Sequence, residues 1–265
     1  MRIAQAVVAI LALHLSACEP RAAPPALETA RAPAGDAVVR VAGVSTGTRL
    51  ASRLATAFET RSPGSPVLVE APIGRPIEAL ADGLIDAALV ITTGDVPPAP
   101  FALALARTRA VLAVGGGVGI RALAPGEWAR TLYGTAGPWP GGLPRQVVLR
   151  PAEDPLQRAL AEQHPVVAAA LDRALAAGRW PVERRDGALL GALRRRVGSI
   201  AVTDTGNSRL TGSPVWTLDL GRPPPALTLW LVTAEHPPER LVHFVAFLRG
   251  SEARGLIADD GFEVP

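Results

Sequence analysis

Four small residues between an apolar run and an amphipathic run have the greatest potential for chemistry in this 265-residue chain. They form a turn rich in hydroxyl groups: Ser45, Thr46, Gly47 and Thr48. Before them Val38–Val44 predicts a strand, and after them apolar residues at helical spacing predict a helix. The first backbone N–H groups of a helix lack intrahelical partners, and the helix dipole is positive at that end. Hydroxyl and N–H donors therefore converge, and the sequence predicts a site for a small anion.

The same turn has two other interpretations. Residues 43–47, Gly-Val-Ser-Thr-Gly, match the G-x-S-x-G pattern of a nucleophile elbow, which would make Ser45 the nucleophile of an esterase. That elbow normally follows several strands and an oxyanion loop, whereas here only an N-terminal leader and a tether precede it. His164, His236 and His243 also lack an obvious acid-flanked loop. The third interpretation is a turn that uses small residues for geometry alone.

Two charged residues could complete an anion site. Arg150 directly follows an apolar strand at 146–149, and its guanidinium could hold an oxyanion through two parallel hydrogen bonds. Asp86 comes directly before another apolar run, and it could accept the proton of a ligand such as hydrogen phosphate. The alternatives are a salt bridge for Arg150 and a capping carboxylate for Asp86.

Composition excludes several other classes. The chain has no lysine, so it has no phosphate loop of the G-x-x-x-x-G-K type, and the glycines at 115–119 have the wrong spacing for a dinucleotide site. Scattered histidines and a single cysteine offer no metal-ligand set, so we expect neither a metal nor a cofactor. Aromatic residues make up only 4% of the chain and the net charge is +3, so we expect no nucleic-acid partner.

The N-terminus indicates export and lipidation. Arg2 precedes a short apolar run, 3–15, which suits the core of a signal peptide. It ends in Leu-Ser-Ala-Cys, which resembles a bacterial lipobox. We therefore expect a signal peptide at 1–17, a lipid on Cys18, and an Ala/Pro-rich tether at 18–36 that holds the protein at a membrane surface of the periplasm or cell envelope. The alternative is an ordinary exported protein with an incidental free thiol.

Strand-like and helix-like runs alternate along the rest of the chain, which predicts α/β architecture with parallel strands. Strands are expected at 67–70, 87–91, 101–105, 110–114, 146–149, 199–202 and 227–233. Helices are expected at 77–81, 125–133, 156–163, 166–177 and 186–195, with two more after residue 240.

Several segments in this order resemble the solute-binding proteins of phosphate-type ABC importers. They are VRVAGVSTGTRLASRLATAFETRSPG, IEALADGLIDAALVI, QVVLRPAEDP, GSIAVTD and the C-terminal LTLWLVTAEHPPERLVHFVAFLRGSEARGLIADDGFEVP. The resemblance implies a type II periplasmic-binding fold, with two α/β lobes, a two-strand hinge and a ligand between the lobes. Lobe 1 would contain 37–107 and 210–265, and lobe 2 would contain 108–209.

The resemblance also implies a function and a site. The protein would be a monomer that captures a small anionic solute, phosphate first, for an ABC permease of the inner membrane. The ligand contacts would be Ser45–Thr48, Arg75, Asp86 and Arg150. The family has a Ser/Gly/Thr stretch after its arginine, whereas this chain has Pro-Ala-Glu-Asp-Pro-Leu at 151–156. Arg75 would then compensate, the solute would differ, or the site would serve a non-transport binding or sensor module.

Overall fold

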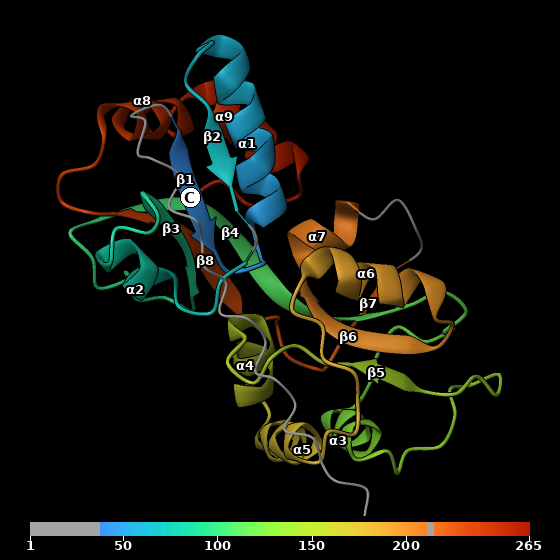
Figure 1. Ribbon diagram of the computed structural model, residues 1–265. Helices are drawn as coiled ribbons and strands as arrows, with labels where there is room; N and C mark the ends of the chain where they lie inside the picture. The colour runs from blue at the N-terminus through green and yellow to red at the C-terminus, as the bar shows by residue number, and fades with distance from the viewer. Residues whose placement is uncertain (1–37, 71, 211–214) are drawn as a thin grey trace, which may run out of the picture. The chain divides into compact units, whose positions relative to one another are not determined.

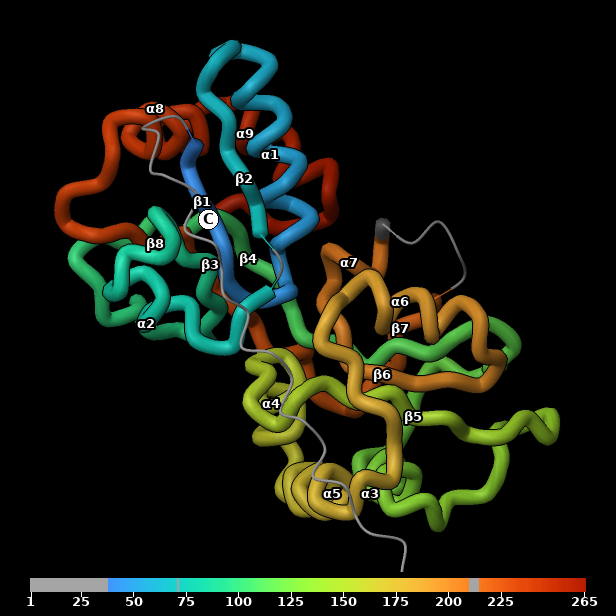
Figure 2. Tube along the Cα trace, in the orientation of Figure 1, coloured from blue at the N-terminus to red at the C-terminus, as the bar shows by residue number. Residues whose placement is uncertain are grey.

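The fold is organised around one long strand, β4 (Phe101–Val114), which belongs to two sheets (Figure 1). The computed structural model describes residues 38–70, 72–210 and 215–265. Residues 101–109 of β4 pair antiparallel with β8 (Ala226–Thr233), and residues 110–114 pair antiparallel with β6 (Ser199–Asp204). Figure 2 shows the strand running from the first sheet into the second.

The expectation of two separate strands at 101–105 and 110–114 is therefore wrong. The intervening residues keep the alternation of a strand, since Ala106 and Thr108 are buried while Arg107 is exposed. A register shift between Ala104 and Ala106 marks a bulge, which bends a strand without ending it.

The first sheet has the order β2-β1-β3-β8-β4. Its parallel strands are β1 (Val39–Gly43), β2 (Val67–Val69) and β3 (Ala87–Thr92). Alternate side chains of these strands point to opposite faces, so each face buries its own layer. One face packs against α1 (Thr48–Arg61), α8 (Glu239–Leu248) and α9 (Ser251–Asp259), and the other packs against α2 (Pro76–Ala81).

The second sheet contains the rest of β4 with β6, β5 (Gln146–Val148) and β7 (Trp216–Leu218). One face is covered by α3 (Pro125–Tyr133), α4 (Pro155–Glu162) and α5 (Pro165–Ala176). The other face packs against α6 (Asp186–Arg195), through Leu189 and Leu193. A short helix, α7 (Thr205–Leu210), directly follows β6.

Each sheet with its helices is a lobe, and the chain passes between the lobes twice. The first passage is β4 itself, and the second joins β7 of the second sheet to β8 of the first. Because β7 pairs with the second half of β4, the strand pairing places the return later than the expected residue 210. The sequence analysis missed α7 and β7, which are short; α7 contains Gly206 and Asn207, both poor helix formers.

The described residues contain no helix long and apolar enough to cross a bilayer. The expected signal peptide, Cys18 and the tether lie outside the described residues.

Candidate functional site

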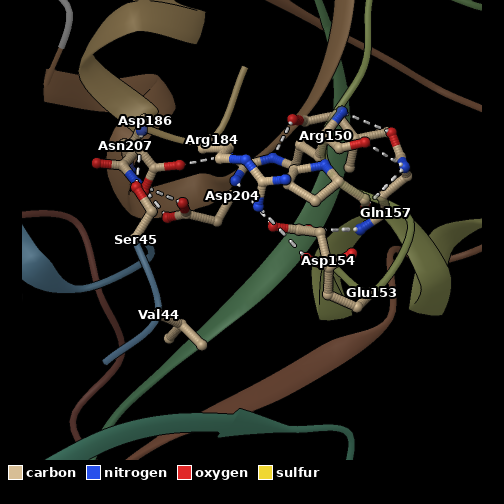
Figure 3. Close-up of polar contacts among 12 residues, drawn as sticks. Val44, Ser45, Arg150, Glu153, Asp154, Gln157, Arg184, Asp186, Asp204 and Asn207 are labelled. Atoms are coloured by element: carbon tan, nitrogen blue, oxygen red, sulfur yellow. Dashed lines mark hydrogen bonds and ion pairs between the residues drawn. The ribbon is translucent and has the colours of Figure 1, made fainter. Parts of the chain in front are cut away.

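The turn at Ser45–Thr48 joins β1 to α1, as the sequence predicts. The Thr48 N–H donates to the Ser45 carbonyl over 3.1 Å, and the Thr48 hydroxyl donates to the Val44 carbonyl over 3.0 Å. Thr46 is buried, and Ser45 and Thr48 are partly buried. Hydrogen bonds within the turn therefore fix its shape, while the Ser45 side chain points toward Asp186 and Asn207 (Figure 3).

Gly47 sets the entry into α1. It is the residue before the helix, and its φ of 90° lies in the left-handed region that favours glycine. A Cβ atom at this position would lie 2.3 Å from Cδ2 of Leu229, a core residue of β8. Conformation and close packing both require glycine here.

Arg150 follows β5 and is one of the largest fully buried side chains, with 1% exposure. Its Nε donates to the Val202 carbonyl over 2.8 Å, Nη1 donates to Asp154 Oδ2 over 3.2 Å, and Nη2 donates to Asp186 Oδ1 over 2.5 Å. Burial by itself lowers the pKa of Arg150, but the negative charges of Asp186 and Asp154 outweigh burial and raise it. The guanidinium is therefore a permanent buried cation that two carboxylates neutralise.

Asp186, the first residue of α6, connects the two lobes (Figure 3). Its backbone N–H donates to the Ser45 hydroxyl oxygen over 2.7 Å. Its carboxylate accepts from Arg150 at Oδ1 and from Asn207 Nδ2 at Oδ2, the latter over 3.0 Å. Ser45 and Arg150 thus meet through one residue, which bonds the first through its backbone and the second through its side chain.

Asp204 completes the network at the end of β6. It is fully buried and accepts hydrogen bonds from the Asn207 backbone and side chain and from the Thr108 hydroxyl of β4. Burial, followed by the negative charge of Asp186, raises the pKa of Asp204 to about 6, although Asn207 and Arg150 act in the opposite direction. One guanidinium therefore lies among three carboxylates, close to the strand that passes between the lobes.

The raised pKa of Asp204 predicts a specific pH dependence of stability. The pKa is about 6 in the folded protein and 3.8 for an ordinary aspartate, so folding takes up a proton between these values. The contribution is fully present below about pH 4 and is lost as the pH rises through about 6, with a total of roughly 3 kcal/mol at ~1.4 kcal/mol per pKa unit. Urea unfolding from pH 4 to 7 should show wild type losing stability relative to Asp204→Asn as the pH rises.

That comparison isolates Asp204 because other titrating groups, such as His164, are common to both proteins. The charged groups facing Asp204 are Asp186 and Arg150, and Asn207 and Thr108 are its neutral partners. A stability difference that stays constant with pH, or that grows in favour of wild type above pH 6, would contradict the assignment.

The structure separates the other two predicted contacts. The Ile73 N–H donates to the Gly43 carbonyl over 3.0 Å, so the loop that leads to Arg75 lies at the same end of β1 as Ser45. The Arg75 side chain is 82% exposed and forms an ion pair with Glu78 at 3.6 Å. Arg75 is thus an exposed cation at the same edge of the first sheet as Ser45.

Asp86 lies at the opposite end of β1, where its carboxylate accepts the Arg40 N–H over 2.7 Å. Ser45 lies five residues after Arg40 in the chain, which is a separation of roughly 16 Å at about 3.3 Å per residue. The structure does not bring Asp86 to Ser45, and its carboxylate bonds the backbone of β1 rather than capping a helix or a turn.

The sequence analysis did not identify Asp154, Asp186, Asp204 or Asn207 as site residues. Asp154 carried a local signal, because it lies four positions after Arg150 and caps α4 through the Gln157 N–H. Asp186 appeared only as a helix start, since its bonds to Ser45 and Arg150 span long stretches of sequence. A small cavity in the described part of the chain is lined partly by Gln157 and Val202, which also hydrogen-bond Arg150, but not by these four residues.

The bond found for the Ser45 hydroxyl within residues 38–70, 72–210 and 215–265 runs to the Asp186 N–H. A nucleophilic serine needs a general base that accepts its proton, and a backbone N–H is a donor. This arrangement is unlike the serine–histidine pair of a hydrolase.

The two sheets and the shared strand β4 form a two-lobed α/β structure with the type II periplasmic-binding fold, as predicted. Solved structures with this fold include a putative phosphate ABC transporter substrate-binding protein with bound phosphate from Clostridium perfringens, at 13% identity and a TM-score of 0.66, covering 86% of this chain and 100% of that one. The molybdate-binding protein of Azotobacter vinelandii has 13% identity and a TM-score of 0.58, covering 86% of this chain and 99% of that one.

A reduced form of OxyR from N. meningitidis also shares the fold, at 13% identity and a TM-score of 0.58, covering 83% of this chain and 97% of that one. At these identities the similarity shows the fold alone. No protein-family model and no curated protein matches the sequence.

Proposed function

We propose that this chain is an exported, lipid-anchored solute-binding protein that captures a small oxyanion between its lobes. Phosphate is the first candidate solute, and the protein would act as a monomer that delivers it to an ABC permease of the inner membrane. Cys18 would carry the lipid. The fold shared with phosphate and molybdate receptors supports this proposal.

One observation carries the proposal. The interlobe network already holds an oxyanion, the carboxylate of Asp186, with Arg150 on one oxygen and Asn207 on the other. Ser45 lies on the first-lobe side of the same residue. Charge-assisted donors to two oxygens of one buried group are the chemistry that an oxyanion receptor needs. Lobe closure over the solute would then present a surface to the permease.

A binding screen tests the proposal. Phosphate, sulfate, molybdate, tungstate and a phosphonate should be titrated into the full-length protein, with thermal unfolding and calorimetry as readouts. We expect at least one of these anions to raise the melting temperature. Ser45→Ala should weaken binding about 10- to 150-fold, because a hydrogen bond to a charged group contributes about 1.5–3 kcal/mol.

The control for that variant is Ser65→Ala, which removes a hydroxyl from the connection between α1 and β2, at the other end of α1 from the turn. It should bind as wild type does. A folded protein that none of the five anions stabilises would overturn the proposed function, and Ser45-dependent hydrolysis of an ester would support the esterase instead.

A second candidate function is a non-transport binding or sensor module. It is favoured by the pairing of Arg150 with Asp186 and Asp154, which leaves the guanidinium neutralised before any solute arrives.

A further inference from the structure

Asp186 occupies the anion-binding face of Arg150. In the described part of the chain, the Arg150 side chain donates hydrogen bonds to the Val202 carbonyl, Asp154 and Asp186, and it is only 1% exposed. The Asp186 side chain is 10% exposed and lies on Nη2. An external anion can therefore reach Nη2 only if the Asp186 carboxylate leaves.

Backbone contacts hold Asp186 in this position. The segment before it is tied to the end of β5, since the Glu183 N–H donates to the Leu149 carbonyl over 2.8 Å and Leu149 N–H donates to the Pro181 carbonyl over 2.9 Å. The Asp186 N–H donates to Ser45 across the lobes. A group tethered beside its partner has a high effective concentration, so it competes strongly with any free ligand.

Resting on the proposed function, we infer that Asp186 is an intramolecular competitor of the solute. Its carboxylate accepts the hydrogen bonds of Arg150 and Asn207, and its N–H donates to the Ser45 hydroxyl. The protein's own carboxylate therefore occupies the position between the lobes that the solute would take. A solute must displace this carboxylate to bind. The solute that does so should carry more charge and more acceptor oxygens than a carboxylate, as a dianionic tetrahedral oxyanion such as hydrogen phosphate does.

The competition makes Asp186 a specificity-determining residue. A bound monocarboxylate would only replace the hydrogen bonds that the Asp186 carboxylate already forms with Arg150 and Asn207. Wild type should therefore not bind formate or acetate. The remaining carboxylates, Asp154 and Asp204, would repel any anion that enters, and this raises the requirement for extra hydrogen bonds. Wild-type affinity should equal the intrinsic affinity multiplied by the fraction of molecules in which Asp186 has left the site.

Asp186→Ala tests the inference, because it leaves Arg150 Nη2 and Asn207 Nδ2 facing the space that the carboxylate filled. We expect the variant to bind phosphate at least ten-fold more tightly than wild type. We also expect millimolar formate or acetate to raise the melting temperature of the variant and not that of wild type. Calorimetry and thermal unfolding measure both effects.

The matched control is Asp172→Ala, which removes one carboxylate from the same lobe. Asp172 is 59% exposed and pairs with Arg158 at 2.7 Å, so this variant should bind phosphate and formate as wild type does. Asp186→Asn is the second variant, for use if the alanine variant does not fold: its neutral amide competes for Arg150 less strongly than a carboxylate, so it should bind phosphate more tightly than wild type does.

The outcomes separate this inference from the proposed function. The inference would be overturned if phosphate bound wild type and variant with equal affinity and formate did not raise the melting temperature of the variant. The proposed function would then still stand. Binding to the variant but not to wild type would support the inference and favour the sensor module. Tighter binding to the variant, with measurable binding to wild type, would support both. No anion binding to either folded protein would overturn both.

Discussion

Arg150→Met should lower the free energy of unfolding by about 3–5 kcal/mol, the usual cost of removing one partner from a buried ion pair. The substitution keeps an unbranched apolar chain of similar length but leaves the buried carboxylate of Asp186 without its cation. Urea unfolding of the purified variant at pH 7, monitored by circular dichroism, measures the change.

The matched control is Arg158→Met, since Arg158 pairs with Asp172 on the surface of the same lobe. Exposed pairs contribute about 0–1 kcal/mol, so this variant should unfold nearly as wild type does. The double variant Arg150→Met with Asp186→Asn should recover part of the loss, because it removes the unpaired charge as well. A loss for Arg150→Met no larger than that for Arg158→Met would show that the buried pair does not hold the second lobe.

Gly47→Ala should be the second most damaging single change and should act on both stability and the site. The new methyl group would lie 2.3 Å from Leu229 Cδ2, and an overpacked core typically costs about 1–3 kcal/mol. The left-handed φ of 90° adds about 1–2 kcal/mol for a residue with a Cβ. We therefore expect a total loss of about 2–5 kcal/mol in urea unfolding.

The two causes can be separated by a second substitution. Gly47→Ala in a Leu229→Ala background meets no Leu229 side chain beyond Cβ, so only the conformational cost should remain. Gly119→Ala is the control, since an added Cβ there meets nothing within 4 Å and its φ is not in the left-handed region. Equal losses for Gly47→Ala in both backgrounds would exclude the packing contribution.

Local chemistry in the sequence was sufficient to predict the strand, turn and helix around Ser45 and Gly47. Hydroxyl residues, a glycine and an apolar period of helical spacing all indicate the same element, and each acts over a few residues. The α/β class followed from the alternation of such elements. The continuity of β4 did not, because Arg107 and Arg109 interrupt the apolar run although the backbone stays extended.

The candidate site was less predictable, because its bonds join distant segments. Arg150 could be recognised at the end of an apolar strand, but no local pattern indicated which carboxylate would reach it. Asp86 and Asp186 both border apolar elements. Of these two, Asp186 accepts a hydrogen bond from Arg150, whereas Asp86 accepts the Arg40 N–H at the other end of β1. The order of the strands and the packing of the lobes determine which aspartate contacts Arg150, and neither is a local property of the sequence.

The shared strand β4 also dictates the order in which the chain can fold. Every partner of β4 lies far downstream, at 199–204, 216–218 and 226–233, and β3 likewise waits for β8. During synthesis from the N-terminus, the second sheet therefore stays open until β6 and β7 are made, and the first sheet stays open until β8 is made. Such non-local pairing slows folding. Truncation before β8 would leave the first sheet without the strand that joins β3 to β4 and should abolish the native structure of the first lobe.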